Sequence, residues 1–346
     1  MKVAVMVLNF GEPEHATVEE VVPYLEKIFM LGNSTLGAKA TDEEMRARAH
    51  ELAVRRAPGL IEEYQLIGTS PNNAQARAEA HAVERELRAR GQDAYSYVGM
   101  QFTDPSIEDA VKRARDDGAE MVIGLPAYPI CGPTTTVAAL AQMRRAMEAL
   151  DWDVPVCEIT GWHTHTAYIE IRAAVIRRTL IENNVDLSDP RTKLVFSAHG
   201  TPMEYIRQGS RYVLYVEHAI AAIARELDVQ DYALGYQNHS NRPIEWTQPD
   251  ITEVIANIDA DTVVVDPCTF MHEQSETLAE LDHELKEQAE ARGLRFVRVP
   301  VPHDDPRYYK LLADLCEPFI QSQYEEAGFR PCLCRPGAYC LNSVVS

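Results

Sequence analysis

Strand-length apolar runs that alternate with helical segments constrain the fold of this chain more than any other feature. The runs are rich in β-branched residues and occupy residues 2–9, 94–99, 121–125, 154–160, 193–197, 231–236, 262–265 and 294–299. Helical patterns lie between them, at residues 17–30, 73–90, 106–117, 135–150, 165–182, 211–227 and 274–291. Repetition of strand and helix predicts parallel sheets that helices cover on both faces. The fold class is therefore α/β.

Length and strand spacing together predict two domains. The chain has 346 residues, which is more than one ordinary hydrophobic core accommodates. Half of the strand-like runs precede residues 161–165 and half follow them. We therefore expect two similar halves, each a small doubly wound sheet.

The charge balance and the apolar runs exclude several classes of protein. The formal net charge of −20 would repel a phosphate backbone, so we expect no nucleic-acid partner. No apolar run reaches the roughly 18 residues that a membrane-spanning helix needs. The N-terminal residues also lack the pattern of a secretory signal, so we expect a cytoplasmic protein.

A histidine follows one predicted strand directly, at the place where open α/β sheets bind ligands. The segment reads Phe-Ser-Ala-His-Gly-Thr-Pro, and its histidine is His199. An imidazole in this position can accept a proton or bind a metal, although a hydrogen-bonded loop histidine is the simpler alternative. No glycine-rich phosphate loop follows any predicted strand, so the sequence does not support nucleotide binding.

Three carboxylates recur at helical spacing after the seventh predicted strand. Glu273, Glu276 and Glu280 stand at positions i, i+3 and i+7, so one helix would carry them on one face, and wider helical turns would align them further. Such a stripe of oxygen ligands suits a hydrated divalent cation. A solvated helix face is the alternative interpretation.

The C-terminal tail contains a cluster of cysteines. Cys332, Cys334 and Cys340 lie within nine positions of a segment that also holds proline and glycine. Three thiolates and one distant cysteine satisfy a four-coordinate iron–sulfur or zinc site. A tail with uncoordinated thiols is the alternative. The remaining cysteines, any of which could supply the fourth ligand, are Cys131, Cys157, Cys268 and Cys316.

Taken in order, these motifs resemble the ferrochelatase family almost from end to end. The resemblance rests on residues 8–13 (LNFGEP), 55–58 (RRAP), 67–71 (IGTSP), 126–129 (PAYP), 196–202 (FSAHGTP), 209–212 (GSRY), 236–246 and 276–282 (ETLAELD). Members of this family insert ferrous iron into a porphyrin to make haem. The resemblance implies the class II chelatase fold, which has two Rossmann-like domains, each with a parallel four-stranded sheet, and a porphyrin cleft between them.

The resemblance also implies domain limits. Residues 1–160 would form the first domain and residues 161–304 the second. A helix at about residues 305–328 would return to the first domain, and residues 329–346 would form the cysteine-bearing tail.

Functional residues follow from the same resemblance. The invariant histidine of the family falls on His199 and its essential glutamate on Glu276, while Glu273 and Glu280 take the places of acidic residues on the path of metal or protons. Positions around the macrocycle correspond to Phe10, Tyr128, Tyr212 and Trp246, and positions that bind its propionates correspond to Arg56 and Ser70. A planar apolar ring with carboxylate edges needs such aromatic and cationic partners.

Some ferrochelatases carry a structural 2Fe–2S cluster on three C-terminal cysteines and one loop cysteine. Cys332, Cys334 and Cys340 fit that arrangement, with Cys131 favoured over Cys157 as the fourth ligand. Three segments depart from the family pattern. Gln101-Phe102 replaces an Arg-Tyr pair, Gln274 replaces the histidine next to the essential glutamate, and residues 130–133 (ICGP) stand where the family usually has polar and aromatic residues.

Three alternatives stay open at this stage. The chain could be a chelatase for another tetrapyrrole, a non-catalytic porphyrin or iron–sulfur binding protein on the same scaffold, or a two-lobed sugar-type binding protein. The sequence does not choose between protoporphyrin IX and coproporphyrin III. It also leaves the oligomeric state and any peripheral membrane contact open.

Overall fold

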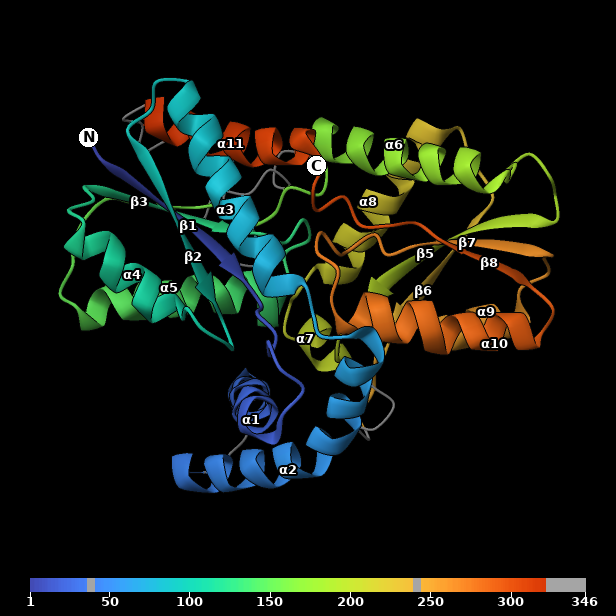
Figure 1. The fold of residues 1–346 in the computed structure, drawn as a ribbon, viewed down its shortest axis with the longest axis horizontal. Coiled ribbons are helices and arrows are strands. Elements are labelled where there is room, and N and C mark those ends of the chain that lie inside the picture. The colour runs from blue at the N-terminus through green and yellow to red at the C-terminus, as the bar shows by residue number, and fades with distance from the viewer. Residues whose placement is uncertain (36–40, 239–243, 322–346) are drawn as a thin grey trace. The chain divides into compact units, whose positions relative to one another are not determined.

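Two parallel sheets form the framework of the chain in the computed structural model, which describes residues 1–35, 41–238 and 244–321 (Figure 1). One sheet contains β1 (Val3–Asn9), β2 (Ala94–Met100), β3 (Met121–Pro126) and β4 (Val156–Glu158), and the other contains β5 (Thr192–His199), β6 (Tyr232–Gln237), β7 (Thr262–Asp266) and β8 (Arg295–Arg298). Their strand orders are β2-β1-β3-β4 and β6-β5-β7-β8, with parallel pairing throughout. The predicted α/β class with two four-stranded parallel sheets is confirmed.

The chain divides into two compact units, each built on one sheet. The first unit comprises Met1–Gly161 together with the segment that begins at Tyr309, and the second comprises Trp162–Tyr308. The first unit is therefore discontinuous in sequence.

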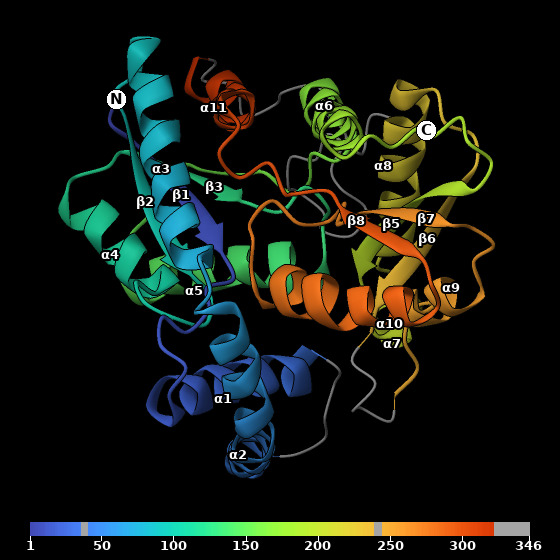
Figure 2. The same cartoon turned by 45° about the vertical axis from the view of Figure 1, so that its right-hand side comes forward.

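In the first unit, helices cover both faces of the sheet (Figure 1). The helices α4 (Ile107–Asp116) and α5 (Ala138–Ala149) pack on the face that carries Ala4, Met6 and Leu8. The opposite side holds α3 (Asn72–Ala89) and α11 (Pro306–Gln321), as Figure 2 also shows. Every residue of β1 is buried, as is typical of a central parallel strand. The remaining elements are α1 (Val18–Thr35), α2 (Asp42–Ile67) and the short π-helix η1 (Pro133–Val137).

The second unit repeats this arrangement. The helices α6 (Thr166–Asn183) and α8 (Tyr212–Leu227) lie on one side of the sheet in Figures 1 and 2. A core on the other side joins β5 and β7 to α9 (Ile251–Asn257), η2 (Glu276–Leu285) and α10 (Lys286–Ala291). A one-turn helix, α7 (Met203–Arg207), follows β5. The element η2 is a π-helix of ten residues, a rare wide-turn form that is frequently found at functional sites.

Candidate functional site

His199 is the last residue of β5, a central strand of the second sheet. Its ring nitrogen Nδ1 lies 2.6 Å from the carbonyl oxygen of Gly200. A carbonyl oxygen only accepts hydrogen bonds, so Nδ1 carries the hydrogen and donates it. In the neutral ring Nε2 is then left with its lone pair, and the side chain is 36% exposed. The turn that follows is tight, because a Cβ on Gly200 would stand 2.6 Å from the carbonyl oxygen of Gln237.

Glu276 opens η2 and faces this imidazole. Its Oε1 lies 3.7 Å from Nε2 of His199, and its side chain is 15% exposed. The side-chain amide of Gln274 donates a hydrogen bond to the other carboxylate oxygen, Oε2. The histidine and the glutamate that the sequence singles out therefore meet within the second unit.

A buried glutamine fixes the start of η2 to the sheet. Gln237 ends β6 beside His199, and its Nε2 donates to the carbonyl oxygen of Glu276 and to Oε2 of Glu280, at 2.9 Å in each case. Its Oε1 accepts a hydrogen bond from Ser197 of β5, also at 2.9 Å. This network orients Glu276 and Glu280 relative to the histidine strand. No local pattern in the sequence marks Gln237 for this role.

Glu273 differs from the sequence prediction, because it lies before the helix and not on its face. Its carboxylate accepts two hydrogen bonds from Nη1 of Arg298, at 2.9 and 3.1 Å, and one from the backbone N–H of Val301 at 3.2 Å. The hydroxyl of Thr277 donates another at 2.6 Å. The expectation of one stripe of three carboxylates is thus wrong for Glu273, because the chain becomes helical only at Ser275.

Arg298 also binds Asp282, through Nε at 2.5 Å. Burial raises the pKa of Asp282, and the guanidinium partly opposes that rise. The guanidinium of Arg298 therefore binds two carboxylates, the buried one of Glu273 and the half-buried one of Asp282. Sequence reasoning missed it because its partners lie 16 and 25 positions away along the chain.

Tyr212 and Trp246 both lie close to the histidine strand in the second unit. The hydroxyl of Tyr212 donates a 2.9 Å hydrogen bond to the carbonyl oxygen of His199, and burial raises the pKa of that hydroxyl. Trp246 is buried and pairs through a backbone bridge with Pro202, in the loop that follows His199. Tyr212 therefore supports the backbone of His199 directly through its hydroxyl group.

Phe10 and Tyr128 belong to the first unit, where both are half-buried. The ring of Phe10 lies 4.5 Å from that of Phe102. The hydroxyl of Tyr128 donates to Oε1 of Gln101 at 3.1 Å. The two residues that replace the family's Arg-Tyr pair, Gln101 and Phe102, thus contact the two aromatic candidates of this unit.

Arg56 and Ser70 each already bind a carboxylate of the chain. Nη2 of Arg56 lies 2.6 Å from Oε1 of Glu63. The hydroxyl of Ser70 donates to Glu12, which also accepts from the hydroxyl of Tyr64 at 3.1 Å. Both side chains therefore have the hydrogen-bonding chemistry that a propionate needs.

The predicted cluster ligands are only partly within the described residues. Cys332, Cys334 and Cys340 lie outside them. Cys131 is buried in the loop between β3 and η1. Cys157 is half-buried in β4, where burial and the neighbouring Glu158 raise the pKa of its thiol and so disfavour the thiolate that binds metals. In residues 1–35, 41–238 and 244–321, no three His, Cys, Asp or Glu side chains are grouped as metal ligands.

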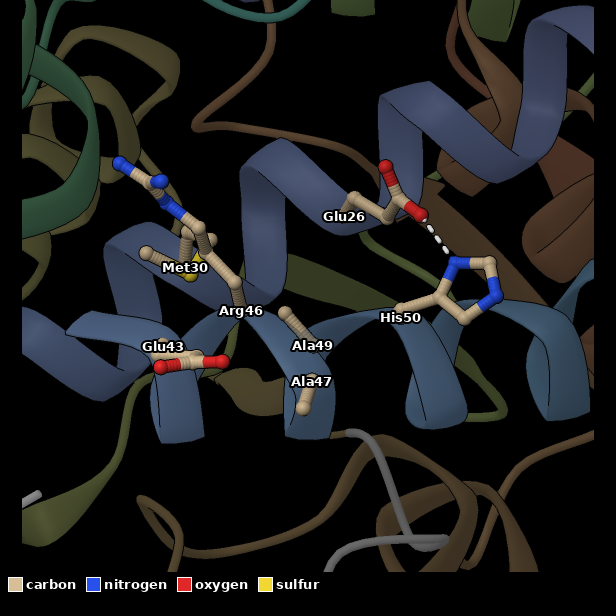
Figure 3. A pocket seen from close by; sticks show the side chains of 7 residues that line it. All are labelled: Glu26, Met30, Glu43, Arg46, Ala47, Ala49 and His50. Carbon is tan, nitrogen blue, oxygen red and sulfur yellow. Dashed lines mark hydrogen bonds and ion pairs between the residues drawn. The ribbon is translucent and has the colours of Figure 1, made fainter. Parts of the chain in front are cut away.

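A separate pocket lies between α1 and α2 in the first unit (Figure 3). Glu26 and His50 form an ion pair on its wall, and none of the predicted site residues lines it.

Among the described helices, none is both long and apolar enough to cross a membrane.

Comparison with known proteins identifies the relatives of the chain. The Ferrochelatase family model matches residues 2–319. The ferrochelatase of Synechococcus sp. (strain RCC307) is 31% identical over 327 residues, which cover 91% of this chain and 82% of that protein. The ferrochelatase of Aquifex aeolicus (strain VF5) is 30% identical, with coverage of 91% and 98%. Among solved structures, SirB from Bacillus subtilis with Fe3+ superposes with a TM-score of 0.56 at 10% identity, covering 93% of this chain and 96% of SirB, a similarity of fold.

Proposed function

Because the chain belongs to the ferrochelatase family, it is a lyase that inserts ferrous iron into a porphyrin to form haem, and we propose that His199 and Glu276 carry out the insertion. The supporting observation is the 3.7 Å distance between Nε2 of His199 and Oε1 of Glu276. The relatives favour haem synthesis over the other tetrapyrrole chelatases and over a binding protein without activity.

Insertion replaces the two pyrrole N–H protons of the porphyrin by one Fe2+, so the site needs a base and ligands that displace water from iron. Nε2 of His199 is the acceptor of a pyrrole proton, because Nδ1 is already committed to Gly200. Glu276 carries the proton onward or binds the entering iron. Glu280 continues the path along η2. The carboxylate of Glu273 is bound by Arg298, so we assign Glu273 a structural role.

Four aromatic residues bind the porphyrin ring in this proposal: Phe10, Tyr128, Tyr212 and Trp246. Arg56 and Ser70 bind the propionates in exchange for Glu63 and Glu12, the carboxylates that they bind without substrate. A charge-assisted bond from a guanidinium is well suited to this exchange.

We further propose a structural 2Fe–2S cluster on Cys131, Cys332, Cys334 and Cys340. Such a cluster would join the cysteines of the tail to the loop after β3. The support is the spacing of the tail cysteines and the position of Cys131 in a loop, in contrast to the strand position of Cys157. The cytoplasmic location and the domain limits stay predictions.

The active-site proposal is tested with His199→Ala and Glu276→Gln in a stopped assay with ferrous iron and porphyrin. We expect each variant to lose about 100-fold or more in kcat, the usual contribution of a proton-transfer group. Quenching of porphyrin fluorescence should persist in Glu276→Gln. Exposed residues of similar chemistry provide controls, His81→Ala and Glu287→Gln. Normal insertion by His199→Ala would refute its role as proton acceptor.

The cluster proposal is tested by spectra of anaerobically purified protein. Cys334→Ser and Cys131→Ser should lose visible absorbance and bound iron, and Cys157→Ser should retain both. An unchanged spectrum in Cys334→Ser contradicts the cluster. Loss in Cys157→Ser with retention in Cys131→Ser would reassign the fourth ligand.

A further inference from the structure

The loop that follows β7 contacts His199 from two directions. The hydroxyl of Thr269 accepts a 3.1 Å hydrogen bond from the backbone N–H of His199. The ring of Phe270 lies 6.3 Å from the imidazole. The backbone N–H of Cys268 donates to the carbonyl oxygen of Ser197 at 3.0 Å, which joins the loop to β5 two residues before the histidine. The conformation of this loop therefore sets the position of the imidazole.

Helix α6 holds the same loop from its other side. Arg172 forms an ion pair with Asp266, the last residue of β7, and its Nη1 donates to the carbonyl oxygen of Phe270 at 3.2 Å. One turn earlier on the helix, the hydroxyl of Tyr168 donates to the carbonyl oxygen of Cys268 at 2.6 Å. The loop is thus fixed by side chains of α6 at its beginning, middle and end.

The Arg172–Asp266 pair is unusual because both side chains are fully buried, with 0% exposure. Burial raises the pKa of Asp266, and the guanidinium opposes that rise, as expected for a charge that must be paired to stay ionised. Replacement of a buried ion pair by well-packed apolar residues is often neutral or stabilising. The pair is therefore weak evidence for added stability, and its contacts with the loop favour a role in fixing the loop geometry.

We propose that Arg172 and Asp266 are positioning residues of iron insertion, which act by fixing the 267–270 loop and through it the imidazole of His199. The inference rests on the proposed function, because it requires His199 to accept the proton. Neither residue needs to touch substrate. Removal of the pair leaves a folded protein whose imidazole is displaced from Glu276, and a displacement of about 1 Å can cost about 100-fold in rate.

The decisive variant is the apolar double substitution Arg172→Leu/Asp266→Val. We expect its melting temperature to equal or exceed that of the parent, its porphyrin Kd to stay the same, and its kcat to fall about 10- to 100-fold. The matched control is Arg191→Met/Asp261→Asn, an exposed ion pair. It lies at the amino ends of β5 and β7, whereas His199 lies at the carboxyl end of β5. The control should keep the kcat of the parent. A folded double variant with unchanged kcat would overturn the proposal.

Two further variants keep the test complete. If the double variant does not fold, Tyr168→Phe is used instead, because it removes the hydrogen bond from α6 to the loop at Cys268. A drop in kcat of threefold or more at constant porphyrin Kd supports the proposal. An unchanged kcat overturns it. Adding Arg172→Leu/Asp266→Val to His199→Ala should lower the residual rate no further, since the pair acts through His199; an additive loss contradicts the proposal. Full activity of His199→Ala alone would instead refute the proposed function.

Discussion

Replacement of Arg298 by methionine should destabilise the second unit, because it leaves two carboxylates without their cation. The guanidinium is 14% exposed, Glu273 is 11% exposed and Asp282 is 31% exposed. Methionine keeps most of the apolar volume of the side chain, so the change isolates the loss of charge and hydrogen bonds. Val301 and Thr277 still donate to Glu273, but Asp282 loses its ion-pair partner.

The size of the effect follows from the degree of burial. Breaking a fully buried ion pair costs about 3–5 kcal/mol, and partial exposure of Asp282 reduces this, so we expect a loss of about 2–4 kcal/mol. For a unit of this length that corresponds to roughly 4–16 °C in melting temperature. Burial already raises the pKa of Asp282, and without Arg298 no guanidinium opposes that rise, so its folded-state pKa lies above that of the unfolded chain. The folded state then binds more protons, so stability declines as pH rises through this range, and the loss is larger at pH 8 than at pH 5.

Urea unfolding followed by tryptophan fluorescence measures this loss, since Trp162 is fully buried in the second unit. Arg295→Met is the matched control, because Arg295 lies exposed in the same strand and its side chain donates to a backbone carbonyl oxygen, that of Asn183, and not to a carboxylate. The control should stay within about 0.5 kcal/mol of the parent. Equal stability of Arg298→Met and the parent at pH 8 would show that these carboxylates do not depend on Arg298.

Three further predictions concern other parts of the described chain. Gln237→Leu strips three buried hydrogen bonds and should cost about 2–4 kcal/mol in urea unfolding, with a fall in kcat as Glu280 loses its donor. Gly200→Ala should cost about 1–3 kcal/mol and lower kcat without changing the porphyrin Kd, because the new Cβ meets backbone oxygen at 2.6 Å. Arg90→Ala removes the bond between α3 and α11 and should cost about 1–3 kcal/mol by urea unfolding at pH 7. Burial would raise the pKa of Asp314, but hydrogen bonds from Lys310 and Arg90 lower it overall, so this contribution is present above about pH 3.8 and is lost as pH falls through the folded pKa.

Local patterns in the sequence were sufficient to predict the sheets. Each strand is a short apolar run, and the rule that parallel strands align their carboxyl ends directed attention to His199. The sequence does not predict helix α2 clearly, because the helix contains Pro58 and its buried face consists largely of the small residues Ala49, Ala53 and Ala57. Such a face gives a weak apolar period.

Contacts between distant segments could not be predicted in this way. Helical spacing and the family resemblance both place Glu273 on the metal path, yet its carboxylate binds Arg298, 25 positions later. The Arg172–Asp266 pair joins residues 94 positions apart, and no local pattern marks either of them. The role of a side chain that pairs with a distant residue can be recognised only in the folded structure, where the two residues lie side by side.

The discontinuity of the first unit has a consequence for biosynthesis. The second unit is one continuous stretch of chain, so all of it has been made before the part of α11 that belongs to the first unit, from Tyr309 onward, is synthesised. Arg90 and Asp314 are 224 positions apart, which makes this contact among the last to form during synthesis. The inserted unit can thus complete its fold while the first still lacks its closing helix, which reverses the usual order in which the N-terminal domain matures first.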